Sequence, residues 1–116
     1  MKRSVIALAC GMAMGAGVQP ASAATEAEVL EANIRAMQVA YACRHTSDAM
    51  YRATYKAAKR AAVRYSFEIP GAERRVFELH KALQDGTVAP PKISKAKCEG
   101  AVEDAIDEAM LLQREL

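Results

Sequence analysis

Residues that favour sheets or interrupt helices are scarce in this chain. It has no tryptophan, only two phenylalanines and four prolines among 116 residues. β-Branched residues form no long run, whereas alanine, glutamate, lysine and arginine, which favour helices, are common. This composition argues against a β-sheet domain and predicts an all-α protein.

Motifs that are typical of enzymes are also missing from the sequence. It contains no glycine-rich phosphate-binding loop, no nucleophile elbow and no paired-histidine zinc motif. No nucleophilic side chain has a general base at a recognisable spacing. We therefore predict no catalytic residues, no cofactor and no enzymatic activity.

Long apolar runs are confined to the N-terminus. Lys2 and Arg3 precede an apolar stretch over residues 5–18. Residues 21–23, Ala-Ser-Ala, then carry the small-x-small pattern that signal peptidase recognises. We predict a signal peptide over residues 1–23 that is cleaved at its end.

Two other interpretations of this segment are less favourable. A membrane anchor is disfavoured because glycines interrupt the apolar stretch, which is also short for a bilayer span. Lipidation at Cys10 is disfavoured because Ala7, rather than a large aliphatic residue, lies three positions before it. No other stretch is apolar enough to cross a bilayer. Residues 24–116 are therefore predicted to form one small domain that is exported to the periplasm, with full secretion as the alternative.

Cysteine is rare, and its number bears on the fold. Of three cysteines, Cys10 is lost with the signal peptide. The other two, Cys43 and Cys98, are expected to form one disulfide in an oxidising compartment. Closing a loop of roughly 55 residues would stabilise the fold by about 4 kcal/mol. A reactive or metal-binding pair is disfavoured because no Cys-x-x-Cys spacing is present.

Charge is distributed unevenly along the chain. Removal of Lys2 and Arg3 lowers the formal net charge from +2 to zero. Residues 35–97 are nevertheless strongly basic, whereas residues 99–116 are strongly acidic. Zero net charge and export together argue against a nucleic-acid partner.

Apolar residues recur at three- and four-residue steps in four segments. The inward faces are expected to include Phe77 on the third helix and Met110 on the fourth. Thr25 and Glu28 fit a capping box at the start of the first helix, and Gly86 fits a glycine cap after the third. A polar interruption after Cys43 predicts that the first two helices are separate, with one continuous rod over residues 26–65 as the alternative. We predict a compact bundle of about four helices, which span residues 25–43, 47–67, 72–84 and 94–114.

The helix predicted over residues 47–67 has an apolar face and a basic face. Its basic residues recur at four-residue steps, which places like charges next to one another. One interpretation is a binding surface for another protein or an anionic ligand. The alternative, which analogy with coiled coils favours, is pairing with an acidic series on the last helix. The basic residues are Arg52, Lys56, Arg60 and Arg64, and the acidic residues are Glu99, Glu103 and Asp107.

Tyr51 and Tyr55 are further candidates for partner binding, because they lie beside the basic series. Together with Tyr41 and Tyr65 they could line a groove that stacks a ligand. Their spacing fits better with rings that are buried in the core and hydroxyls that reach its rim. Tyr51, which precedes Arg52, is the least clearly assigned of the four.

His45, Asp48 and His80 are the side chains with the best claim to metal binding. His45 and Asp48 could share one helical face, but a transition-metal site needs three or four ligands. Nothing in the spacing requires His80 to approach the other two. No metal site is therefore predicted, and a metal or small-ligand carrier is kept as an alternative function.

The sequence thus favours a small periplasmic binding or interaction protein, which holds a partner by the basic face or by an apolar groove. Its size, export signal and single wide disulfide are similar in organisation to small periplasmic acid-stress chaperones. A chaperone that loosens when Glu99, Glu103 and Asp107 are protonated is the main alternative. The oligomeric state is open at this stage.

Overall fold

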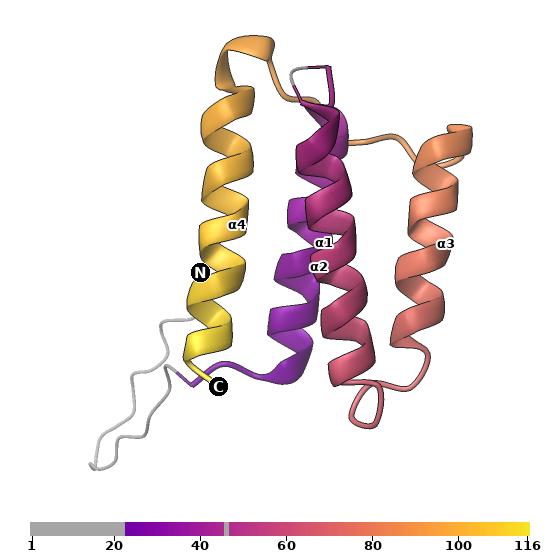
Figure 1. The fold of residues 1–116 in the computed structure, drawn as a ribbon, viewed down its shortest axis with the longest axis vertical. Coiled ribbons are helices and arrows are strands. Elements are labelled where there is room, and N and C mark those ends of the chain that lie inside the picture. The colour runs from indigo at the N-terminus through magenta and orange to yellow at the C-terminus, as the bar shows by residue number, and fades with distance from the viewer. Residues whose placement is uncertain (1–22, 46) are drawn as a thin grey trace, which may run out of the picture.

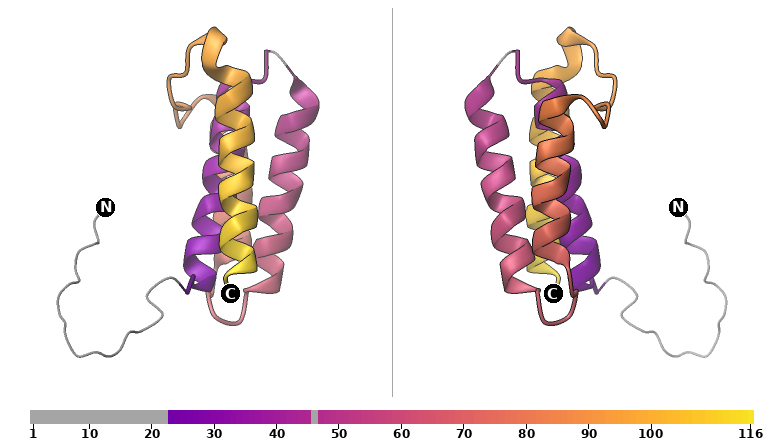
Figure 2. Two further views of the ribbon diagram at one scale, coloured as in Figure 1. Left: turned by 90° about the vertical axis from the view of Figure 1, so that its left-hand side faces the viewer. Right: turned by 90° about the vertical axis from the view of Figure 1, so that its right-hand side faces the viewer.

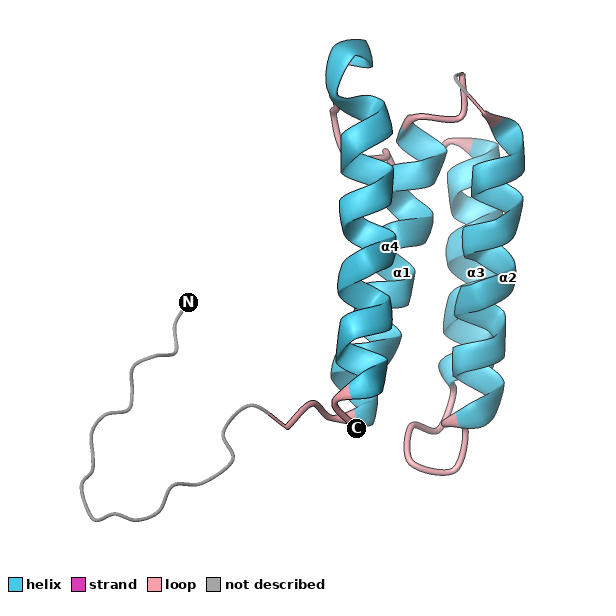
Figure 3. Cartoon of the chain, turned by 60° about the vertical axis from the view of Figure 1, so that its left-hand side comes forward, coloured by secondary structure: helices cyan, strands magenta, loops and turns pink. Residues whose placement is uncertain are grey.

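The computed structural model describes residues 23–45 and 47–116, which form helices joined by loops (Figures 1 and 3). The predicted signal peptide lies, apart from residue 23, outside the described residues. The prediction of an all-α globule of four helices is confirmed. The helices are α1 (Glu26–Ala42), α2 (Asp48–Arg64), α3 (Ala72–Asp85) and α4 (Cys98–Arg114), with a 3-10 turn, Lys95–Lys97, before α4.

Helix α1 lies at the centre of the bundle, because apolar and small side chains surround most of its circumference. Both α2 and α4 pack against α1, and α3 packs against α2 (Figures 1 and 2). The predicted capping box at the start of α1 is confirmed, since Thr25 and Glu28 exchange hydrogen bonds of 2.9 and 3.1 Å. The buried residues of α1 are Val29, Leu30, Ala32, Asn33, Ile34, Ala36, Met37, Ala40 and Tyr41.

The chain reverses its direction between α1 and α2 and again between α2 and α3. The prediction of two separate helices, rather than one continuous rod, is confirmed because α1 ends at Ala42 and α2 begins at Asp48. Gly71 and Gly86 flank α3 with φ values of 84° and 81°, in the left-handed region that glycine adopts without strain. The connector after α3 crosses the end of the bundle, so α4 runs in the same direction as α2 and antiparallel to α1 (Figure 1).

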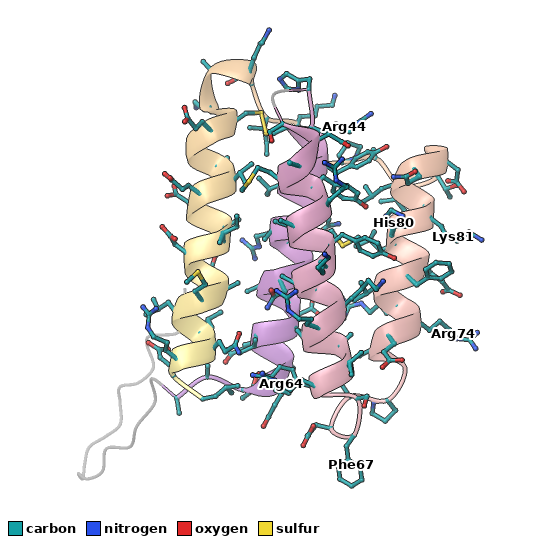
Figure 4. All side chains as sticks on the ribbon, in the orientation of Figure 1. Arg44, Arg64, Phe67, Arg74, His80 and Lys81 are labelled. Carbon is teal, nitrogen blue, oxygen red and sulfur yellow. A yellow bond between two sulfur atoms is a disulfide. The ribbon has the colours of Figure 1, made fainter. Side chains whose placement is uncertain are left out.

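The predicted disulfide is present. It joins Cys43, just after α1, to Cys98, the first residue of α4, with a Cα–Cα distance of 5.5 Å and a sequence separation of 55. Both cysteines are buried, and the bridge is visible as the yellow sulfur–sulfur bond at one end of the helices in Figure 4. It fixes the start of α4 against the end of the central helix.

Two apolar side chains that were expected to face the core are half exposed. Phe77 on α3 is 52% exposed, and the Lys81 ammonium lies 5.7 Å from its ring centroid. Met110 on α4 is 53% exposed. These expectations were wrong because α3 and α4 each pack mainly against one other helix, which leaves only a narrow buried stripe on each.

Aromatic rings hold α3 against α2. The His80 ring stacks on Tyr55 with centroids 4.0 Å apart and an interplanar angle of 9°. The Tyr51 hydroxyl shares a hydrogen bond of 2.6 Å with Nδ1 of His80. Figure 4 shows His80 on the side of α3 that faces α2. A bidentate ion pair between Arg75 and Glu31 also links α3 to α1.

The ionisation of this aromatic cluster reflects its surroundings. Burial, together with the nearby Lys59 ammonium, lowers the pKa of His80 below its usual value of 6.5. Burial and the neighbouring phenol of Tyr55 raise the pKa of Tyr51 to about 12. The neutral forms of both side chains therefore stabilise the contact between α2 and α3.

Removing the disulfide should weaken the whole fold. We expect the double substitution Cys43→Ser/Cys98→Ser to lower the free energy of unfolding by about 2–4 kcal/mol, because the unfolded chain regains its loop entropy. Urea denaturation followed by circular dichroism measures this difference. Unchanged stability of the double variant would contradict it.

Acid should weaken the attachment of α3. Because folding lowers the pKa of His80, its stabilising contribution is present above the unfolded-state pKa and is lost as the pH falls through the folded-state value. The variant His80→Phe keeps an aromatic ring but cannot titrate. Urea unfolding at about pH 7.5 and about pH 5 should show a larger loss of stability in the wild type than in this variant. Equal losses would contradict the assignment to His80.

Candidate binding groove

A groove runs along the bundle, with α1 as its floor and α2 and α4 as its walls. It consists of three hollows of about 550, 270 and 110 Å³, in order from the disulfide end. The two smaller hollows share Asn33, Ala57, Arg60 and Gln113. The largest begins about one helical turn further along, where Ala40 replaces Ala36 in the floor. We call these three hollows together the α2–α4 groove.

The α2–α4 groove exists because none of the helices in residues 23–45 and 47–116 covers this side of α1. Helices α2 and α4 each pack on α1 but make little direct contact with each other. Helix α3 packs against α2 and does not fill the space between α2 and α4 (Figure 1). Alanines on all three helices, such as Ala36, Ala57 and Ala109, leave the hollow wide because their side chains are short.

Partly exposed apolar side chains line the hollow beside the disulfide and the hollow next to it. Met50 on α2 is 37% exposed and Met110 on α4 is 53% exposed, and each lines a hollow. Ile106 lies between them on the α4 wall, half-buried. Methionine side chains are flexible and polarisable, so they adapt to differently shaped apolar partners. This part of the groove suits an apolar segment.

The end of the groove remote from the disulfide is polar and carries hydrogen-bond donors. Arg60, Arg64 and Gln113 line the hollow of about 110 Å³. Tyr65 also lines it, is only 6% exposed, and has a buried hydroxyl without a hydrogen-bond partner among the described residues. A buried hydroxyl without a partner is unfavourable, and guanidinium groups bind carboxylate or phosphate oxygens strongly. This hollow therefore suits an anionic group.

Of the predicted basic residues, Arg60 and Arg64 line the groove. A step of four residues advances about 40° around a helix, so the basic series winds across the surface of α2. Its first member, Arg52, is at the solvent side and pairs with Asp48 at 2.5 Å. Lys56 is exposed and lines none of the three hollows.

The tyrosines that were predicted as binding candidates lie elsewhere. Tyr51 is only 3% exposed, and it packs edge-on against Tyr41 in the core. Tyr55 is half-buried in the stack with His80. The preferred interpretation, rings in the core, therefore matches their positions, and both contribute to the contact between α2 and α3.

The expected pairing of basic and acidic residues across α2 and α4 is not found in the described part of the chain. The ion pairs there join Arg52 to Asp48 and Arg75 to Glu31. The groove separates the two series, and only some members of each series line it, together with Lys95 at the disulfide end. Glu99 and Glu103 line the hollow beside the disulfide, whereas the arginines line the far hollow.

The candidate metal ligands do not form a site. His80 lies in the aromatic stack, Asp48 pairs with Arg52, and His45 is exposed just after α1. Within residues 23–45 and 47–116, no group of three or more histidines, cysteines or carboxylates is placed to hold a metal ion. The structure thus gives no support to a metal carrier.

No known family, curated protein or solved structure matches this chain. In the described part of the chain, none of the helices is long and apolar enough to span a membrane. Any functional inference therefore rests on the α2–α4 groove. One residue could have indicated the groove from the sequence: Asn33 interrupts the apolar face of α1, and it lines two of the hollows.

Proposed function

We propose that this chain is an exported binding protein without catalytic activity, which holds a partner in the α2–α4 groove. The apolar part of the partner lies along Met50, Ile106 and Met110. Its anionic group lies beside Arg60 and Arg64. The observation that carries this proposal is the polar hollow at the end of an apolar groove, where the buried Tyr65 hydroxyl has no partner in the described structure.

The two parts of the groove supply different contributions to binding. Apolar contact with exposed methionines releases water and provides most of the free energy. Arginines at one end fix the position of the partner, because charge-assisted hydrogen bonds are directional. Export is supported by the sequence pattern of residues 1–23 and fits the buried disulfide, which persists in an oxidising compartment. The periplasm is the proposed location.

Site-specific photo-crosslinking in cells tests the groove directly. A photoreactive amino acid in place of Met110 should give crosslinks to a partner, whereas one in place of Val63, which is 58% exposed and lines no part of the groove, should not. The crosslinks should be lost in Arg60→Gln/Arg64→Gln. They should persist in Arg52→Gln/Lys56→Gln, which removes the same charge from the same helix outside the groove.

Two results would contradict this function. Equal crosslinking from positions 63 and 110 would show that contact is not confined to the groove. Unchanged crosslinking in Arg60→Gln/Arg64→Gln would show that the arginines do not hold the partner. Circular dichroism of each variant establishes that the helices remain folded.

An acid-activated chaperone is the second candidate, and one observation favours it. The stack of His80 on Tyr55 gives α3 an attachment that depends on a neutral imidazole. The acidic series on α4 lacks the pairing with α2 that this function was first expected to use. Any loosening in acid would therefore begin at α3.

Dye binding distinguishes the chaperone from the simple binding protein. For a chaperone, the fluorescence of an apolar dye should rise as the pH falls from about 7 to about 4, because detachment of α3 exposes the rings of Tyr51 and Tyr55. The rise should be smaller in His80→Phe. Fluorescence that stays flat over this range would exclude the chaperone.

A further inference from the structure

The charges along the α2–α4 groove are arranged with opposite signs at its two ends. Glu99 and Glu103 outnumber the one cation, Lys95, in the hollow beside the disulfide, and Arg60 and Arg64 line the hollow at the far end. Between them the hollow is lined mainly by apolar and small residues, with Ile106 near the middle and Thr54 as a polar neighbour. A rotation of 180° about an axis that passes through the middle of the groove, perpendicular to the helices, would exchange its acidic end with its basic end. The groove is therefore complementary to a rotated copy of itself.

We propose that a second copy of this chain covers the groove, with α4 of each copy lying in the groove of the other about a twofold axis near Ile106. Such an interface is isologous, so each favourable contact occurs twice. The acidic pair on α4 of one copy then faces Arg60 and Arg64 of the other. The inference rests on the proposed function, because it describes how the same groove is covered until a partner displaces the second copy.

The direction of the helices supports this arrangement. Within one copy, α2 and α4 run in the same direction (Figure 1). After a twofold rotation, α4 of the second copy runs antiparallel to both of them. Antiparallel neighbours bring the positive end of one helix dipole beside the negative end of the other. The polarity of the helices and the charges of the side chains thus favour the same orientation.

The side chains in the groove fit the rotated helix. Rotation about Ile106 carries Met110 of the second copy towards Met50, so two exposed methionines lose contact with water together. It carries Glu99 of the second copy towards the hollow of Arg64 and Tyr65, where a carboxylate could accept a hydrogen bond from the unpartnered hydroxyl. An anionic amphiphile such as a fatty acid would match the arginines, but it has no positive charge for the other end, where Glu99 and Glu103 outnumber Lys95.

Analytical ultracentrifugation of residues 24–116 tests the proposal by exchange of charge. We expect a concentration-dependent dimer that dissociates at high salt, because its charged pairs are partly exposed. Glu99→Arg/Glu103→Arg and Arg60→Glu/Arg64→Glu should each weaken self-association by at least about tenfold, since each places like charges opposite each other twice. A mixture of these two variants should restore the dimer, which a mere folding defect could not do. Asp104→Arg/Glu108→Arg, on an exposed part of α4 that lines no hollow, is the matched control and should still form dimers.

The proposal is overturned if the wild type is monomeric at about 0.1 mM, a concentration at which a dimer with a dissociation constant of about 1 μM would be largely formed. It is also overturned if the two charge-reversed variants associate as the wild type does, or if their mixture stays monomeric. Crosslinking from a photoreactive residue at position 110 distinguishes absence of the dimer from absence of the proposed binding function. A crosslinked homodimer supports the second copy, whereas a monomeric protein that crosslinks from this position to another molecule overturns the second copy and retains the binding function.

Discussion

Burial of α1 on most of its circumference is the constraint on which the rest of the structure depends. Only Glu31 and Arg35 are exposed on this helix after its first turn. A single helix with so much apolar surface must have neighbours on several sides, and α2 and α4 occupy two of them. Because α3 packs on α2 instead, the surface of α1 between α2 and α4 becomes the floor of a groove. The core and the candidate site are thus two consequences of the same helix.

Much of the fold could be predicted because local signals were strong. The capping box at Thr25, the glycine after α3 and the pair of cysteines each act through chemistry that nearby residues or the redox conditions determine. The contacts between helices could not be predicted, because periodicity identifies the apolar face of a helix but not the helix that packs against it. This is why the expected contact between the charges of α2 and α4 was wrong, and why Phe77 and Met110 were placed in the core.

The candidate site could be predicted only in part, for a related reason. Arg60 and Arg64 were among the predicted binding residues, but their distinction from Arg52 and Lys56 depends on where α4 lies. Tyr65 was recognised as a boundary residue, yet its unpartnered hydroxyl is a property of the packed structure alone. The contribution of Gln113, distant in sequence from all of these, required the return of α4 alongside α2.

The position of the disulfide has a consequence for the continuity of the backbone. The segment between α3 and the 3-10 turn is mostly exposed, and it leads directly to the bridged Cys98. Hydrolysis of one peptide bond in this segment would yield two polypeptides that stay covalently joined through sulfur. The C-terminal fragment, which contains α4, would keep its contacts with α1. A cleaved molecule could therefore persist as a two-chain protein until a reductant breaks the disulfide.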